Sequence, residues 1–165
     1  MHRRAVIAGL AATATAGFSS TSQASVPVAY DWNATPPFGD RQAFIDWMVK
    51  NRGEAPGYLG ERFDRFLQLI AHHDVWDDRT KRAYLLVPRE RFVTAANLDR
   101  TYQVHYLDIG YGVTITGPHT VARMTNATDV KRSDRVLEIG TGSVYQPAML
   151  AKLTEQVYSI EIVKP

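Results

Sequence analysis

The spacing of apolar and polar residues predicts three helices in the first half of the chain. Apolar residues recur every three or four positions over residues 41–52, 58–73 and 78–87, which is typical of a helix with one buried face. Asp40 and Gly53 are residue types suited to begin and end the first of these helices. In the second helix we expect one buried stripe, made of Leu59, Phe63, Phe66, Leu67 and Ile70. Together these segments indicate a helical N-terminal layer.

A different pattern begins at residue 136 and predicts a strand, a turn, a helix and a second strand. Val136 to Ile139 has the apolar character of a short buried strand, and Gly140 to Gly142 follows it as a turn. Helical spacing then runs from Tyr145 to Leu153, and Val157 to Ile162 is typical of a second, parallel strand. Since strand, crossover helix and strand form the repeating unit of α/β proteins, the predicted fold class is α/β.

The glycine turn is the first candidate for chemistry. Glycine lets backbone N–H groups approach a ligand closely, and the start of the following helix offers N–H groups that have no intrahelical partner. Glu161 lies 21 positions after Gly140, where an acid near the end of the second strand can accept hydrogen bonds from ribose hydroxyls. The pattern suits a nucleotide-like ligand, although glycines also occur at turns for backbone reasons alone.

Composition excludes several other kinds of chemistry. The chain has 165 residues, of which 45% are hydrophobic and 22% charged, as in an ordinary globular domain. It contains no cysteine, so disulfides, thiolate catalysis and cysteine-ligated metals are excluded. The formal net charge is +2, and loss of Arg3 and Arg4 with a leader would bring it to 0. A neutral chain has no electrostatic footprint for nucleic acid, so no nucleic-acid partner is expected.

Residues 1–24 are predicted to be an export signal. His2 to Arg4 is basic, Ala5 to Phe18 is uncharged, and Ser22 to Ala24 has the small-x-small pattern of a cleavage site. The paired arginines resemble a twin-arginine signal, which implies a periplasmic protein. The alternative is a miscalled start codon and a cytoplasmic protein. The uncharged run is too short to span a membrane as a helix, and residues 25–39, which are rich in proline, are expected to be extended.

A cluster of histidines and acids invites comparison with a metal site. It consists of His72, His73 and Asp74, followed by Asp77 and Asp78. Adjacent side chains on a helix point about 100° apart, so the two histidines cannot both face one ion without distortion. A polar helix end followed by an acidic helix start explains the cluster better, and no metal site is predicted.

Three parts of the sequence resemble, in order, the protein-L-isoaspartate O-methyltransferase family. They are VPRERFV at 87–93, VHYLDIGYGVTITGPHTVARM at 104–124, and VLEIGTGSVYQPAMLAKL at 136–153 with VYSIEIV at 157–163. The resemblance implies a Rossmann-like, doubly wound methyltransferase fold and S-adenosyl-L-methionine as cofactor. It also implies that the substrates are isoaspartyl-containing proteins or peptides. The cofactor contacts that it implies are Glu138, Gly140, Thr141, Gly142, Ser143, Tyr145, Gln146 and Glu161.

The resemblance also places a substrate-side group of residues around Thr116. The family's substrate-side hydroxyl maps to Thr116, which is the candidate catalytic residue, although a threonine there could instead cap the next helix. The other candidates are Thr114, Ile115, Pro118 and His119. An isoaspartyl carboxylate has a pKa of about 4, so the nucleophile is ionised at neutral pH and needs no general base. We therefore expect His119 to be a contact near the pocket and not a base.

Two features set this chain apart from the family's pattern. The family has glycine where Val144 stands, and a β-branched residue narrows the approach to the backbone and disfavours a positive φ. The domain expected over residues 40–165 stops just after the second parallel strand, so we expect a truncated methyltransferase whose fold is incomplete at the C-terminus. The alternative is a secreted, non-catalytic remnant that binds peptides or another protein.

Overall fold

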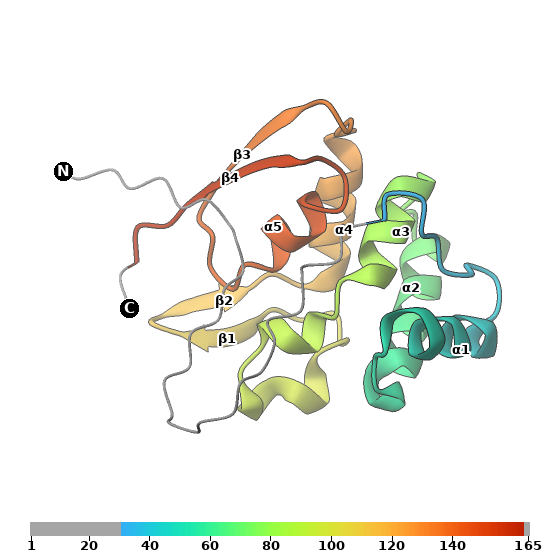
Figure 1. Ribbon diagram of the computed structural model, residues 1–165. Helices are drawn as coiled ribbons and strands as arrows, with labels where there is room; N and C mark the ends of the chain where they lie inside the picture. The colour runs from blue at the N-terminus through green and yellow to red at the C-terminus, as the bar shows by residue number, and fades with distance from the viewer. Residues whose placement is uncertain (1–30, 164–165) are drawn as a thin grey trace, which may run out of the picture.

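The computed structural model describes residues 31–163, which form a helical layer beside a small α/β layer (Figure 1). The helical layer consists of α1 (Arg41–Arg52), α2 (Leu59–Ala71) and α3 (Asp78–Leu86). A single turn of 3-10 helix, η1 (Pro56–Tyr58), leads into α2. The three helices confirm the helical pattern of the sequence.

The α/β layer follows α3 in the chain. Its elements, in chain order, are η2 (Arg89–Phe92), η3 (Ala95–Arg100), β1 (Leu107–Gly110), β2 (Val113–Ile115), α4 (Pro118–Ala127), β3 (Arg135–Ile139), α5 (Tyr145–Leu150) and β4 (Gln156–Ile160). β1 and β2 form an antiparallel hairpin, whereas β3 and β4 are parallel and pair in register along their whole length. α3 contacts α2 on one side and α4 and α5 on the other, so it joins the two layers.

The ends of α1 are those predicted from its capping residues. Oδ1 of Asp40 accepts a hydrogen bond of 2.6 Å from the N–H of Ala43, and Gly53 ends the helix in the left-handed region at φ 61°. α2 ends two residues earlier than expected, because His73 adopts a positive φ of 55° there. α3 ends at Leu86, one residue before the predicted end.

The buried stripe of α2 differs from the prediction at one residue. Leu59, Phe63 and Phe66 are buried as expected, but Leu67 is 45% exposed and Leu69 is buried in its place. Positions 67 and 69 lie on opposite sides of the stripe, and Leu69 lies on the side toward α4, where it lines a cavity with His119 and Arg123.

Aromatic contacts hold the helical layer together. The rings of Phe44 and Phe63 lie 5.3 Å apart, and Phe66 contacts Phe63 at 5.7 Å and Tyr84 of α3 at 6.3 Å. Pairs of aromatic rings at such distances add to the stabilisation that burial alone provides. The core therefore continues without a break from α1 through α2 to α3.

The strands β3 and β4 are covered on one face only. Their alternate residues on one side are partly buried against α4 and α5, while Leu137, Ile139, Tyr158 and Ile160 on the other side are exposed. Ile139 is 81% exposed and Leu137 58%, so the prediction of a buried strand is wrong at these two residues within the described part of the chain. The apolar run in the sequence places apolar residues on both faces of the β3–β4 sheet. No described segment covers the face that carries Ile139.

Two boundaries in this unit also differ from the prediction. α5 spans Tyr145–Leu150, since Ala151 to Leu153 form turns, and β4 ends at Ile160, which places Glu161 just past the strand. Residues 31–39 contain no helix or strand, and the rest of the segment predicted to be extended, residues 25–30, lies outside the described residues. The predicted export signal, residues 1–24, lies outside the described residues. Between residues 31 and 163 no helix is both long and apolar enough to cross a membrane.

Candidate functional site

The glycine turn joins β3 to α5 and opens toward solvent. Gly140 has φ 90° and Gly142 has φ 51°, and both values lie in the region that side chains disfavour. A Cβ atom placed on Gly140 would meet no heavy atom within 4 Å, and one on Gly142 would come no closer than 3.9 Å to Ile109. The backbone of the turn is therefore accessible to a ligand.

The N–H groups of the turn, however, already donate hydrogen bonds within the protein. Those of Gly140 and Thr141 donate to the carbonyl of Ile160 at 2.7 and 3.3 Å, because the parallel pairing continues past the end of β3. The N–H of Gly142 donates to Oε2 of Glu161 at 2.7 Å. These three groups are therefore not free donors for a ligand. Only the bond to the Glu161 side chain can be exchanged for a ligand without opening the strand pairing.

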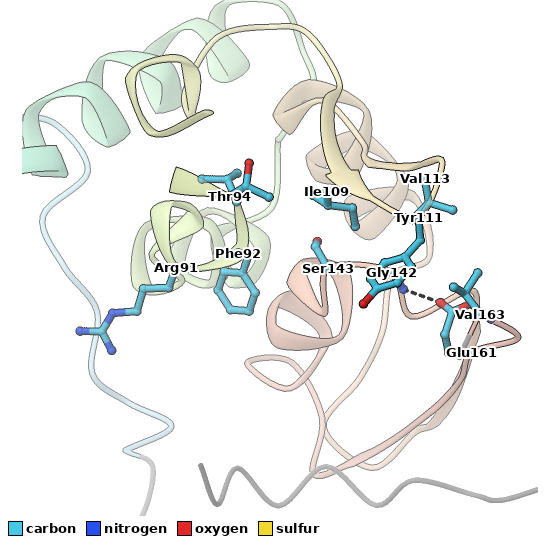
Figure 2. Close-up of a pocket in the computed structure, with 11 residues that line it drawn as sticks. Arg91, Phe92, Thr94, Ile109, Tyr111, Val113, Gly142, Ser143, Glu161 and Val163 are labelled. Atoms are coloured by element: carbon cyan, nitrogen blue, oxygen red, sulfur yellow. Dashed lines mark hydrogen bonds between the residues drawn. The ribbon is translucent and has the colours of Figure 1, made fainter. Parts of the chain in front are cut away.

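Glu161 faces the turn, as the sequence predicted, and Figure 2 shows its bond to Gly142 as a dashed line. Its other oxygen, Oε1, accepts from the N–H groups of Ile162 at 2.7 Å and Val163 at 2.8 Å. These bonds, led by that from Gly142, lower the pKa of the Glu161 carboxyl below its usual value. A carboxylate can accept about four hydrogen bonds, so about one position remains for a ligand hydroxyl.

Glu138 lies beside the same turn but in a drier place. Burial raises the pKa of its carboxyl, a hydrogen bond from the hydroxyl of Ser159 opposes that rise, and the charge of Glu161 adds to it. The hydroxyls of Ser159 and Thr141 lie 2.6 Å apart. The two acids therefore have opposite shifts, with Glu161 held ionised and Glu138 biased toward its neutral form.

Val144 adopts a left-handed backbone conformation, which glycine adopts far more easily than a β-branched residue. Its φ is 69°, and it lies at the N-terminal end of α5. Its N–H donates to the carbonyl of Thr141 at 2.9 Å and its carbonyl accepts from Ala148 at 3.0 Å, so the turn and the helix fix it in place. A β-branched residue in this region is strained, as the sequence analysis expected.

A cavity of about 260 Å³ brings most of the predicted site residues together. Thr114 and Thr116 line it from the hairpin side, Glu138 and the glycine turn from the end of β3, and Gln146 from α5. Ile115 and Ser143 also line it. Residues that lie 30 positions apart in the sequence, Thr116 and Gln146, thus face one space.

A second cavity of about 430 Å³ lies on the other side of the turn (Figure 2). Arg91, Phe92 and Thr94 line it from one side, and Ile109 and Tyr111 line it from the hairpin. Glu161 faces this cavity and not the one that contains Thr116. The turn residues Gly142 and Ser143 line both cavities, so one extended ligand could contact both along the turn.

Three of the predicted residues do not present their side chains at the turn. Tyr145 forms part of the wall of the 260 Å³ cavity, but it is only 1% exposed, and its ring packs edge-on against Phe92 in the core. Pro118 is buried in the first turn of α4. His119 lines a separate cavity of about 300 Å³ together with Arg123 and other residues, so the structure does not bring it to Thr116. The helical direction of α4 decides this, because consecutive residues point to different faces.

The acidic cluster after α2 has structural roles. The carboxylate of Asp74 is buried and pairs with the guanidinium of Arg123, and Asp77 caps α3 by accepting from Arg79 and Thr80. Across residues 31–163, no three histidine, aspartate or glutamate side chains converge as metal ligands would.

Arg89 is the residue beside the site that sequence reasoning missed. It is completely buried, and it donates to the carbonyl of Thr116 at 2.8 Å. Its only signal in the sequence is its place in the VPRERFV segment, because burial of a single arginine leaves no periodic pattern.

The structure has a strand, a glycine turn, a helix and a second, parallel strand with an acid just past its end. This arrangement defines a Rossmann-like type of α/β domain. Comparison with known proteins specifies the type. A family model described as protein-L-isoaspartate(D-aspartate) O-methyltransferase (PCMT) matches residues 63–164, and the chain belongs to this family.

Relatives agree with this assignment. The chain is 52% identical over 98 residues to a protein-L-isoaspartate O-methyltransferase of Opitutus terrae, which covers 59% of this chain and 42% of the relative. It is 43% identical over 101 residues to that of Vibrio parahaemolyticus, covering 61% of this chain and 49% of the relative. The chain thus spans about half the length of the curated relatives it matches.

A solved structure is similar as well. It is a protein-L-isoaspartate O-methyltransferase from Plasmodium falciparum in complex with S-adenosyl-L-homocysteine, with a TM-score of 0.50 and 25% identity. The similarity covers 61% of this chain and 49% of that one. The fold is therefore that of the PCMT methyltransferases, over about half of their structure.

Proposed function

We propose that this chain binds S-adenosyl-L-methionine along the glycine turn and presents it to an isoaspartyl carboxylate near Thr116. The observation that supports this most is the placement of Glu161 and Thr116 on either side of one open turn. The open space in front of Gly140 fits the close approach of a bulky ligand. Family membership supplies the cofactor and the substrate class.

The residues present fit the ribose of such a cofactor in part. Glu161 is ionised and keeps about one accepting position, whereas a ribose diol offers two hydroxyl donors. A second bond to ribose would displace the N–H of Gly142 or of one of the two residues after Glu161. We expect the ribose hydroxyl to displace the N–H of Gly142 from Glu161, because the freed N–H of Gly142 then lies beside the ligand.

The chemistry asks little of the protein's side chains. The cofactor supplies an activated methyl group on a positively charged sulfur, and the acceptor carboxylate is already ionised at neutral pH. Thr116 is exposed in its cavity, and its hydroxyl can donate a hydrogen bond to one oxygen of that carboxylate. The other carboxylate oxygen is then free to accept the methyl group. The turn and the hairpin then act by orientation and by exclusion of water.

Calorimetric titration with S-adenosyl-L-homocysteine tests the binding step. The matched variants are Glu161→Gln, which keeps the shape and removes the charge, and Glu155→Gln, which changes an exposed acid just before β4. We expect Glu161→Gln to weaken binding about tenfold, the usual cost of a hydrogen bond to a charged group, and Glu155→Gln to bind like the parent. Transfer of a labelled methyl group to an isoaspartyl peptide, but not to its aspartyl form, tests the reaction.

A second candidate function is binding of a peptide or protein without methyl transfer. Two observations favour it: Glu161 already occupies the N–H of Gly142, and the outer face of β3 and β4 is apolar and exposed. This candidate predicts no heat with S-adenosyl-L-homocysteine but measurable binding of an isoaspartyl peptide. Heat with the cofactor product and methyl transfer together would exclude it.

Export to the periplasm remains a proposal based on residues 1–24 alone. It predicts that a reporter fused to this leader reaches the periplasm, and that replacing Arg3 and Arg4 by lysine retains the reporter in the cytoplasm. Unchanged export of the lysine variant would exclude the twin-arginine route.

A further inference from the structure

Arg89 is a fully buried cation that connects two parts of the main chain. Its side chain is 0% exposed. Nε donates to the carbonyl of Thr101 at 2.9 Å, and Nη2 donates to the carbonyl of Thr116 at 2.8 Å. Thr101 precedes the β1–β2 hairpin and Thr116 follows it, so one guanidinium fixes both ends of the hairpin.

The same guanidinium lies over the ring of Tyr145. Its central carbon is 4.8 Å from the ring centroid, and Phe92 packs on the ring edge-on at 5.6 Å. A cation over an aromatic face is attracted to it, and the attraction is stronger where water is excluded. Because Tyr145 is the first residue of α5, Arg89 joins the loop that carries Thr116 to the helix that follows the glycine turn.

This arrangement is not one that stability alone would favour. Within the described residues Arg89 contacts no carboxylate, and its Nη1 has no hydrogen-bond partner. Among the same residues, the buried hydroxyl of Tyr84 also lacks a partner. A buried charge that is incompletely paired costs free energy, and an apolar residue of similar size often serves stability as well or better. The contacts of this arginine with the Thr116 loop and with Tyr145 point to a role in the site.

We propose that Arg89 is a positioning residue that sets the spacing between the Thr116 loop and the start of α5, and with it the width of the cavity between them. Both Thr116 and Tyr145 line that cavity, and Arg89 lies behind its wall without lining it. The role assigned to the cavity rests on the proposed function. The mechanical coupling does not, since it consists of contacts within the protein itself.

The test compares Arg89→Lys with Arg82→Lys. Arg82 is a matched control, because it is also buried and donates to a main-chain carbonyl, that of Lys152 at 2.8 Å, but lines a different cavity. Lysine keeps the charge, yet its single ammonium cannot bond both carbonyls and cover the Tyr145 ring in the same way. The first measurement is the backbone amide NMR spectrum without ligand.

We expect Arg89→Lys to shift the amide signals of two separate groups: Thr116 and Gly117 after the hairpin, and Gln146 in α5. Arg82→Lys should shift neither group. In a chain that binds S-adenosyl-L-homocysteine, Arg89→Lys should also weaken that binding about tenfold, as loss of a bond to a charged group does, while Arg82→Lys leaves it unchanged.

Shifts confined to the immediate neighbours of residue 89, or equal shifts in the Arg82 variant, would overturn the proposal. If the parent chain binds no S-adenosyl-L-homocysteine, the proposed function fails, and the NMR comparison still decides whether Arg89 couples the two segments. If Arg89→Lys does not fold, addition of guanidinium ion to Arg89→Ala provides the second test. Return of the Thr116 and Gln146 signals to their parent positions supports the proposal, and failure to return them overturns it.

Discussion

Replacement of Val144 by glycine should stabilise the chain, and replacement by alanine should not. At φ 69° any residue with a Cβ atom is strained, by about 1–2 kcal/mol in general, and a β-branched residue lies at the upper end of the 1–3 kcal/mol range for such positions. Val144 is 39% exposed, so deleting its side chain loses about 1 kcal/mol of apolar burial, roughly three fifths of the value for a fully buried valine.

The balance differs between the two variants. Glycine removes the strain but loses about 0.5–1 kcal/mol through the greater freedom of its unfolded chain. The net expectation for Val144→Gly is a gain of about 0.5–1 kcal/mol over the parent. Alanine loses the same burial and keeps most of the strain, so Val144→Ala should be about 1 kcal/mol less stable than Val144→Gly.

Urea unfolding followed by circular dichroism measures these differences, provided that the slope with urea stays constant among the variants. Ala43→Gly is the control, because Ala43 is exposed within α1 and glycine at a helical position should cost about 0.5–1 kcal/mol relative to alanine. The sign of the glycine effect should therefore reverse between positions 43 and 144. If Val144→Ala is as stable as Val144→Gly, the turn relaxes around the side chain and the strain argument is incorrect. If the glycine variant is stabilised, we also expect it to bind S-adenosyl-L-homocysteine more tightly.

Three further predictions concern other parts of the chain. Leu69→Ala should cost about 2–5 kcal/mol in urea unfolding, because Leu69 is fully buried, while Leu67→Ala on the exposed side should cost well under half as much; equal costs would contradict the observed face of α2. Asp40→Ala should cost about 1 kcal/mol by removing the hydrogen bond to the first turn of α1, and Asp40→Asn should retain most of the stability. The bond from Gly142 holds the pKa of Glu161 below its usual value. The ionised Glu161 therefore stabilises the fold fully above the usual glutamate pKa, and this stabilisation is lost as the pH falls through the lowered pKa of the folded state. Glu161→Gln should flatten the stability profile in that acidic window, measured by thermal unfolding from pH 3 to pH 7, and an unchanged slope would show that Glu161 is not held by the turn.

Local sequence signals predicted the parts of this fold that depend on local physics. Asp40 and Gly53 mark the ends of α1, because capping depends on one residue and its neighbours. The conflict at Val144 followed from its residue type, because a β-branched side chain disfavours the positive φ that the structure shows there. The orientation of Glu161 toward the glycine turn followed from the length of the helix and strand that separate the two, because this length is fixed once the strand–turn–helix–strand unit is recognised.

The features that sequence reasoning missed depend on packing between distant segments. Burial of Leu69 in place of Leu67 follows from the segments that lie on that side of α2, and exposure of Ile139 follows from which layers cover the sheet. Neither is recorded in the periodicity of the segment itself. The same holds for Arg89, whose partners are the carbonyl groups of Thr101 and Thr116. Main-chain acceptors leave no trace in an amino-acid sequence, so this contact required the structure.

The internal hydrogen bonds of the glycine turn change the explanation of why it contains glycine. The N–H groups of Gly140 and Thr141 are bonded to Ile160, so the turn cannot act as a set of free donors for an anion. What Gly140 provides is a positive φ and an absent Cβ atom, and hence a surface that a ligand can contact directly. A cofactor with a positively charged sulfur has no need of many N–H donors beside that sulfur. For such a ligand, shape and a single well-placed carboxylate at Glu161 matter more, and this is the arrangement that the turn retains.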